Sequence, residues 1–330
     1  MALGVGCDQP SGAAATSGGG RSPAEVPSAA PAGAPARPDR ELRAAGHDAG
    51  SSELPAARGE QAIAWPLAAL TWRGELAGDS FDATDARGRT WVLVLASTTQ
   101  PRPDRRPRAY LRVARALGLT TVAECSLTRL PVGRLGELLE NQPAALEQVK
   151  RRATIGNDGT IMALAYQTCS GRSLDVASNE QVARWRELAR GASPLTAADE
   201  PLVRGYVEMA VLDYLTGNIE GRSLWLSSDG ARTCLGPQAG AFPGFLPPAA
   251  GQELLGRVRP IAHFPPRLEQ ALVRLDRSIA QELLLGGPFA QWLIGPRDLG
   301  DLLERRDTLL SLLQALRDRR PGPDASATVE

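Results

Sequence analysis

Residues 204–243 read RGYVEMAVLDYLTGNIEGRSLWLSSDGARTCLGPQAGAFP and are the most informative part of the sequence. Apolar residues at helical spacing predict a buried helix that runs to Thr216. Gly217 is expected to end this helix, because glycine readily adopts the positive φ found just beyond many helices. The apolar positions of the helix are Val207, Ala210, Val211, Tyr214 and Leu215.

A polar loop and a β-hairpin follow this helix. The loop, residues 218–222, carries one acid and one base. After it, SLWLSS alternates as a strand does, Asp229-Gly230 is a strong hairpin signal, and ARTCL is the returning strand. Such a rigid platform is suited to presenting functional side chains on its loops.

The order of these blocks resembles the catalytic segment of atypical kinases. These are the HipA-like proteins, the bacterial phosphatidylinositol 3-/4-kinase-like family and the secretory-pathway kinases, whose pattern runs roughly D-[FY]-L-x-G-N-x-D-R-H, then a strand pair, then D-N-G-x-A-F. The resemblance implies an α+β, two-lobed protein-kinase-like fold with a small mixed β lobe and a larger helical lobe. The matching residues are Asp213, Tyr214, Leu215, Gly217, Asn218, Ala241 and Phe242.

The positions that carry the chemistry of these families are mostly changed. The catalytic Asp falls on Glu220, and the metal-binding Asp falls on Pro237. The nucleotide-anchoring Lys falls on Val94 or Leu95, and its Glu partner falls on Arg106, so both halves of the ion pair are missing. The resemblance therefore implies a pseudokinase: a binding or regulatory module with little or no phosphotransfer.

Five side chains remain as degenerate candidates for chemistry. Glu220 keeps a carboxylate but is longer than Asp by one methylene. Asn218 either binds a metal ion through its side-chain oxygen or caps the loop, and Asp213 is expected to hydrogen-bond the loop backbone. Arg222 and Lys150 are candidates for contact with a phosphate, each with a purely structural alternative: Arg222 as a brace of its loop and Lys150 as a solvated cation at a helix C-terminus. No metal site is expected.

Three functions stay open on these residues. The first is the pseudokinase, for which no cofactor is expected and a protein partner is unidentified. The second is an active, divergent phosphotransferase that uses Glu220 with ATP and Mg²⁺ or Mn²⁺. The third is an envelope scaffold that binds no nucleotide.

Composition excludes several other classes of function. The chain of 330 residues has 37 basic and 37 acidic residues, which gives no electrostatic basis for binding nucleic acid. Lys150 is the single lysine, and the two histidines are His47 and His263. A Ser-His-Asp triad and a multi-histidine metal site are therefore excluded.

The four cysteines are Cys7, Cys125, Cys169 and Cys234, which lack C-x-x-C spacing and so do not indicate a zinc site. We expect buried single thiols, and a Cys125–Cys169 bridge stays open for an oxidising compartment. Gly6-Cys7 ends a short apolar run as in a bacterial lipoprotein signal, but that run is short and has no basic residues before it. Two interpretations follow: a cytoplasmic protein as written, or an envelope lipoprotein acylated at Cys7 if the true start lies upstream.

Composition shifts predict four regions. Residues 1–60 form a disordered tail, 61–165 a small-lobe region, 166–320 a helical region, and 321–330 a second tail. We expect strands at 91–95 and 121–127 and a hairpin at 155–167 between the lobes. The expected helices are 103–118, 135–150, 174–189, 266–285 and 298–319.

Overall fold

The computed structural model describes residues 67–74, 80–119, 121–220, 223–236 and 238–319, all within the unit Pro55–Glu330. Cys7, Arg222 and Pro237 lie outside the described residues, so the roles considered for them stay untested.

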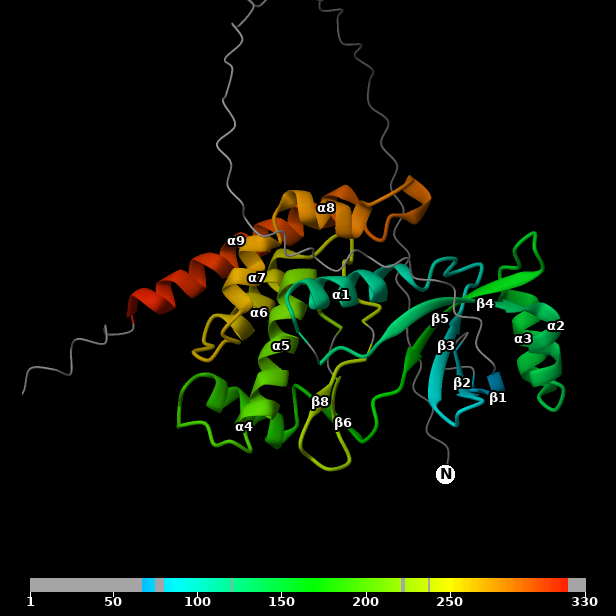
Figure 1. The fold of residues 1–330 in the computed structure, drawn as a ribbon, viewed down its shortest axis with the longest axis horizontal. Helices are drawn as coiled ribbons and strands as arrows, with labels where there is room; N and C mark the ends of the chain where they lie inside the picture. Colours follow the sequence, from blue (N-terminus) through cyan, green and yellow to red (C-terminus); the bar gives the residue numbers. More distant parts are fainter. Residues whose placement is uncertain (1–66, 75–79, 120, 221–222, 237, 320–330) are drawn as a thin grey trace, which may run out of the picture. The chain divides into compact units, whose positions relative to one another are not determined.

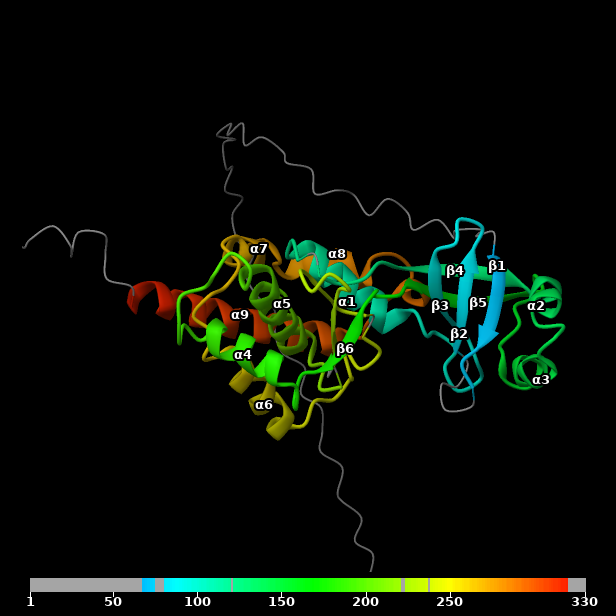
Figure 2. The ribbon, with the colours of Figure 1, turned by 90° about the horizontal axis from the view of Figure 1, so that it is seen from below.

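A five-stranded antiparallel sheet forms the first part of the fold (Figure 1). Its strands run in the order β1-β2-β3-β5-β4, so β3 and β4 both pair with β5. Helices α2 and α3 lie in the sequence between β4 and β5 and are seen beside the sheet in Figure 2. The bounds are β1 Leu67–Trp72, β2 Ser80–Asp85, β3 Thr90–Leu95, β4 Cys125–Pro131, α2 Val132–Leu138, α3 Pro143–Arg152 and β5 Thr160–Gln167.

Side chains of β3 alternate between two cores, as the two-residue period of a strand requires. Leu93 and Leu95 are buried in a core that includes Leu135 and Val149 of α2 and α3. Val94 points the other way and packs against the second, larger core. The side of β3 that faces the helical part therefore presents Val94, not Leu95.

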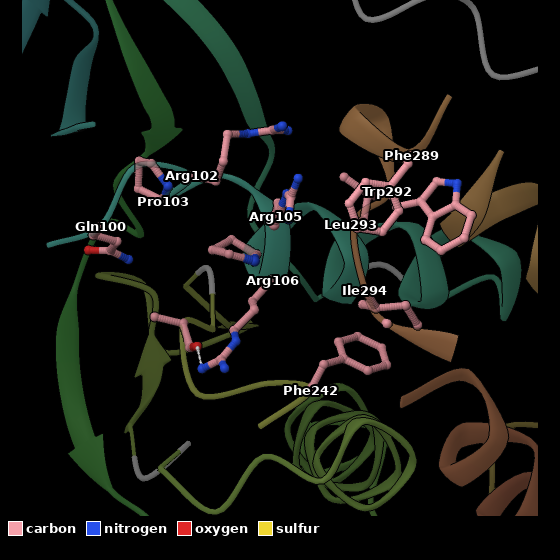
Figure 3. Close-up of a pocket in the computed structure, with 13 residues that line it drawn as sticks. Gln100, Arg102, Pro103, Arg105, Arg106, Phe242, Phe289, Trp292, Leu293 and Ile294 are labelled. Carbon is pink, nitrogen blue, oxygen red and sulfur yellow. Dashed lines mark hydrogen bonds between the residues drawn. The ribbon is translucent and has the colours of Figure 1, made fainter. Parts of the chain in front are cut away.

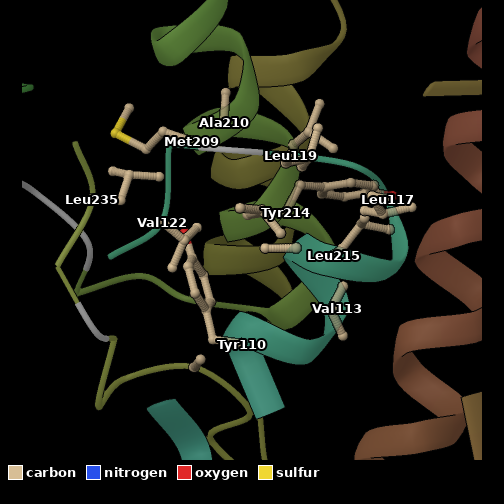
Figure 4. Packing of buried hydrophobic residues seen from close by; sticks show 14 of the residues in the cluster. Tyr110, Val113, Leu117, Leu119, Val122, Met209, Ala210, Tyr214, Leu215 and Leu235 are labelled. Carbon is tan, nitrogen blue, oxygen red and sulfur yellow. The ribbon is translucent and has the colours of Figure 1, made fainter. Parts of the chain in front are cut away.

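The helical part is organised around α5, Glu200–Thr216, which contacts α4, α6 and α9 (Figure 1). Its residues from Tyr206 to Thr216 are all buried. Figure 4 shows Tyr110 and Val113 of α1 in the same cluster as Tyr214 and Leu215 of α5. The remaining bounds are α1 Arg105–Ala116, β6 Arg172–Asp175, α4 Glu180–Ala189, β7 Ser223–Leu226, β8 Thr233–Cys234, α6 Pro248–Val258, α7 Leu268–Arg274, α8 Arg277–Leu285, η2 Phe289–Gln291 and α9 Pro296–Arg319.

The predicted α+β organisation, with an antiparallel sheet lobe and a helical lobe, is confirmed. The predicted hairpin of β7 and β8 is also present, and its Gly230 has φ 70°. Gly118 follows α1 with φ 68°, as expected for the glycine that ends a helix.

Several predicted elements are wrong in extent. The helix expected at 174–189 begins only at Glu180, because Asn179 caps it through bonds from Gln181 N (3.0 Å) and Val182 N (3.3 Å). The residues before that cap form β6, which pairs with β7. The strand expected at 121–127 is β4, at Cys125–Pro131.

The hairpin expected at 155–167 is also different. Its turn exists, with Gly159 at φ 71°, but Ile155 makes only an isolated bridge to Ile161. The second half is β5, an inner strand of the sheet rather than a link between lobes. Two expected long helices, 135–150 and 266–285, are each split in two: the first is interrupted before Pro143, and the second restarts where Asp276 accepts a bond from Ile279 N (2.9 Å).

Candidate functional site

The loop after α5 is placed by the way this helix ends. Gly217 has φ 67°, a conformation that residues with a Cβ rarely adopt. A Cβ at this position would also lie 3.2 Å from Nη1 of Arg305, which donates to the Leu215 carbonyl (2.9 Å). The positive φ therefore favours glycine, the Arg305 guanidinium leaves little room for a Cβ, and the turn directs Asn218 back toward the helix.

Asn218 links the loop to the segment 236–242. Its side-chain nitrogen donates to Asp213 Oδ1 (2.7 Å) and to Gln238 Oε1 (3.1 Å). Gln238 in turn donates to the Gly236 carbonyl (3.0 Å). The Asn218 Oδ1 atom is buried and has no hydrogen-bond partner among the described residues. A buried acceptor without a partner is costly and often marks a place where water or a ligand binds.

Asp213 is fully buried behind this loop, and burial raises its pKa from 3.8 to about 7. The bonds from Asn218 and from Tyr110 (3.5 Å), together with the charge of Arg257, act in the opposite direction. We expected Asp213 to bond loop backbone amides, but its side chain meets other side chains instead. Its Oδ2 atom has no partner among the described residues.

Glu220 stands at the edge of the same loop and is exposed. A Cβ on Gly240 would come within 2.6 Å of Glu220 Oε2 and 2.8 Å of Asn218 Oδ1. Both oxygens therefore lie close to the backbone of the 236–242 segment, which only glycine permits. Phe242, which closes the segment, donates its backbone N–H to the Thr216 carbonyl (2.8 Å) and holds a positive φ of 53°.

A pocket of about 270 Å³ opens beside Glu220. It lies where β3 and β5 of the sheet meet the loops around α5, and its lining is rich in polar groups. Arg73 and Glu220 are the charged residues among its described lining. The lining residues are Arg73, Val92, Tyr166, Gln167, Thr168, Cys169, Glu220, Trp225, Gly236 and Gln238.

The positions assigned by resemblance to the nucleotide-anchoring cation and acid lie on β3 and α1. Val94 occupies the inward position of β3, and Leu95 is buried on the opposite face. Arg106, on the first turn of α1, makes one long contact from Nη1 to the Ala239 carbonyl (3.5 Å). Valine and arginine, at Val94 and Arg106, cannot form the lysine–glutamate ion pair that an active kinase uses.

Lys150 lies on α3 and pairs with Glu147 (2.8 Å), with about 60% of each side chain exposed. It does not line the pocket at Glu220. This position agrees with the structural alternative, a solvated cation near a helix C-terminus, and the contact of Lys150 with a phosphate stays a prediction.

Cys169 and Cys234 form a disulfide, with their Cα atoms 5.9 Å apart. The bridge considered from the sequence, Cys125–Cys169, is therefore wrong, and so is the expectation of thiols at Cys169 and Cys234. Cys125 is buried in the larger core and is not part of the bridge. The disulfide ties the segment after β5 to β8, just ahead of Gly236, and so braces one wall of the pocket.

Sequence reasoning missed several polar members of the site, among them Gln238, Tyr110, Thr168 and Arg73. Gln238 lies inside the quoted stretch and could have been noticed from its position two residues before Gly240. The other three reach the site from distant segments, and no local pattern indicates them.

A metal cluster and a membrane-spanning helix each have requirements that the described residues do not meet. No group of three or more His, Cys, Asp or Glu side chains there could hold a metal ion. None of the described helices is long and apolar enough to cross a membrane.

Solved structures resemble this chain in fold. The Golgi casein kinase matches with a TM-score of 0.51 at 12% identity, covering 78% of this chain and 74% of that chain. The same kinase with Mn/ADP bound matches with 0.51 at 13% identity and the same coverage. Hydra Fam20 with sugar matches with 0.52 at 10% identity, covering 79% of this chain and 88% of that one. These likenesses show a protein-kinase-like fold, which confirms the predicted fold class.

No family model matches the sequence, and no curated protein matches it either.

Proposed function

We propose that this kinase-like protein is a pseudokinase, a binding or regulatory module with little or no phosphotransfer. One observation carries the proposal: the inward position of β3 holds Val94, while the single lysine of the chain sits on α3 and pairs with Glu147. Phosphoryl transfer needs a cation on the nucleotide phosphates and an acid to orient it. Neither is present at the matching positions.

The charges around the pocket at Glu220 support the same proposal. Nucleotide phosphates would meet the carboxylate of Glu220, with Arg73 as the only cation in the described lining. Asp213 is a structural group in this proposal: it is fully buried, and its pKa of about 7 means that it is only partly ionised near neutral pH. A neutral or hydrogen-bonding ligand suits such a pocket better than a triphosphate.

A second candidate function is an active, divergent phosphotransferase with ATP and a divalent metal. It is favoured by Asn218 Oδ1 and Glu220 Oε2, two oxygens that both face Gly240, of which the first has no described partner. Mg²⁺ is often held by one or two protein oxygens together with substrate phosphates and water. These two groups meet that minimum, so they are the residues that would hold a metal and, through it, neutralise phosphate charge.

Nucleotide binding and labelling separate the two candidates. Purified protein is melted with and without ATP, each with Mg²⁺ or Mn²⁺, and then incubated with γ-labelled ATP beside a Glu220→Gln control. We expect no metal-dependent label above that of Glu220→Gln, and at most a small shift in Tm. Robust labelling that Glu220→Gln abolishes would reject the pseudokinase and favour the transferase.

We also infer that the protein works in an oxidising compartment, such as a cell envelope or the exterior. The Cys169–Cys234 bridge supports this, since disulfides persist mainly outside reducing cytosol. Thiol alkylation of protein from its native host, with and without prior reduction, tests it: the two cysteines should be labelled only after reduction. Labelling without reduction would contradict the inference.

A further inference from the structure

A second pocket, of about 360 Å³, shares no lining residue with the pocket at Glu220. It lies between the start of α1 and the short η2 turn (Figure 3). Arg102, Arg105 and Arg106 line it from the α1 side, and Phe289 and Trp292 from the other. Phe242, at the end of the 236–242 segment, forms part of its wall.

The lining of this pocket contains three arginines and no acid. The nearby Asp104 is completely buried, which by itself would raise its pKa, but its pairs with Arg102 (2.9 Å) and Arg108 (2.8 Å) hold the pKa below its usual value. The charge of Asp104 is thus already matched by two cations. Arg105 and Arg106 remain as additional positive charge.

Most donors of Arg105 and Arg106 are unused among the described residues. Arg105 donates from Nη2 to the Ala290 carbonyl (3.3 Å), and its Nε is buried without a partner. Arg106 makes only its 3.5 Å contact to Ala239, although each guanidinium carries five N–H donors. Asp298 is the acid that interacts electrostatically with Arg106. Its carboxylate already accepts hydrogen bonds from the backbone N–H groups of Gly244 and Gly295.

The aromatic side of the pocket is held in place. Trp292 donates its indole N–H to Gly287 (3.2 Å) and meets Phe289 edge to face, with ring centres 4.9 Å apart. Arg102 also donates to the Ala290 carbonyl (2.7 Å), so two arginines tie the η2 turn to the start of α1. Phe289 nevertheless remains 73% exposed, so its ring is accessible to a ligand.

We propose that this pocket binds a phosphate monoester. Its phosphoryl group would accept hydrogen bonds from Arg105 and Arg106, because guanidinium groups match phosphate oxygens in charge and in geometry. Its organic part would lie against Phe289 and Trp292. This is a ligand site separate from the one at Glu220 and does not depend on the absence of phosphotransfer.

Calorimetric titration of the full chain with two probes tests this proposal at fixed ionic strength. The probes are inorganic phosphate, which tests the arginines alone, and phenyl phosphate, which adds a ring for the aromatic side. We expect both to bind, phenyl phosphate more tightly. Arg106→Gln should weaken both by about tenfold, the equivalent of losing one charge-assisted bond. Trp292→Ala should weaken phenyl phosphate and leave inorganic phosphate unchanged.

Arg115→Gln is the matched control, because Arg115 lies on the last turn of the same helix, is exposed and pairs with Glu124. It should bind both probes as the unchanged protein does. The proposal fails if neither probe binds at millimolar concentration, if Arg115→Gln loses as much affinity as Arg106→Gln, or if the two probes bind equally. Arg105→Gln gives the same readout should Arg106→Gln fold poorly.

Discussion

Replacing Asp213 by Asn should remove a pH dependence of stability that its burial creates. Its pKa is raised in the folded protein from 3.8 to about 7, so the folded state holds a proton that the unfolded chain releases. This contribution to stability is complete below pH 4 and is lost as pH rises toward 7. Each pKa unit corresponds to about 1.4 kcal/mol, and the loss between pH 5 and pH 8 is therefore on the order of 3 kcal/mol.

Asn has the shape of the protonated acid and no titratable proton. It can still accept the bond from Asn218, so Asp213→Asn should fold and should lack the loss of stability that Asp213 causes between pH 5 and pH 8. Denaturant melts at several pH values measure the difference between the variant and the unchanged protein. That difference should grow in favour of the variant by roughly 3 kcal/mol across this range.

Asp229→Asn is the control for this experiment, since Asp229 is exposed in the β7–β8 turn and hydrogen bonds lower its pKa. Its difference from the unchanged protein should stay constant from pH 5 to pH 8. Taking the difference also cancels the contributions of other titrating groups to stability. Asp298 is one of these groups, because burial raises its pKa as well. A constant difference for Asp213→Asn would refute the assignment of a protonated, buried acid.

Two further predictions concern the frame of the site. Cys234→Ser should lower the free energy of unfolding by about 4 kcal/mol, because the bridge closes a loop of 65 residues and restricts the unfolded chain. Reductant should lower the Tm of the unchanged protein but not that of the variant, and equal responses to reductant would contradict this. Gly217→Ala should lower the free energy of unfolding more than Gly118→Ala does. Both glycines have φ near 68°, so each alanine should meet backbone strain of about 1–2 kcal/mol, but only Gly217 faces Arg305. Equal costs in denaturant melts would show that the Arg305 contact is unimportant.

The central part of the fold could be predicted because its signals are local. The helix that ends at Gly217, the turn at Gly230 and the helix after Pro103 each depend on neighbouring residues and on a glycine free to take positive φ. The failures have a common cause in contacts made at a distance. Nothing within 172–175 shows that these residues pair with β7, and only that pairing makes them a strand.

The site was predictable in position but not in its interactions. The block around Asn218 locates the loop, yet the partner of Asn218 is Gln238, twenty residues later, and that of Asp213 is Tyr110 on α1. The disulfide was not predicted for the same reason, because Cys169 and Cys234 come close together only when β6, β7 and β8 have paired. Sequence spacing alone cannot choose among the possible pairings of four cysteines.

The distribution of positive charge connects the two pockets. Under the proposed pseudokinase function, the inner strand carries Val94 where an active kinase has the cation that holds the nucleotide phosphates. A cation lies instead on α1, where Arg106 reaches the Ala239 carbonyl. Positive charge is therefore concentrated on the α1 side, where Arg105 and Arg106 have donors to spare, while an anion at Glu220 would meet a carboxylate. Because Arg106 and Ala239 both line the α1 pocket, an anion bound there would compete with the Ala239 carbonyl for Arg106.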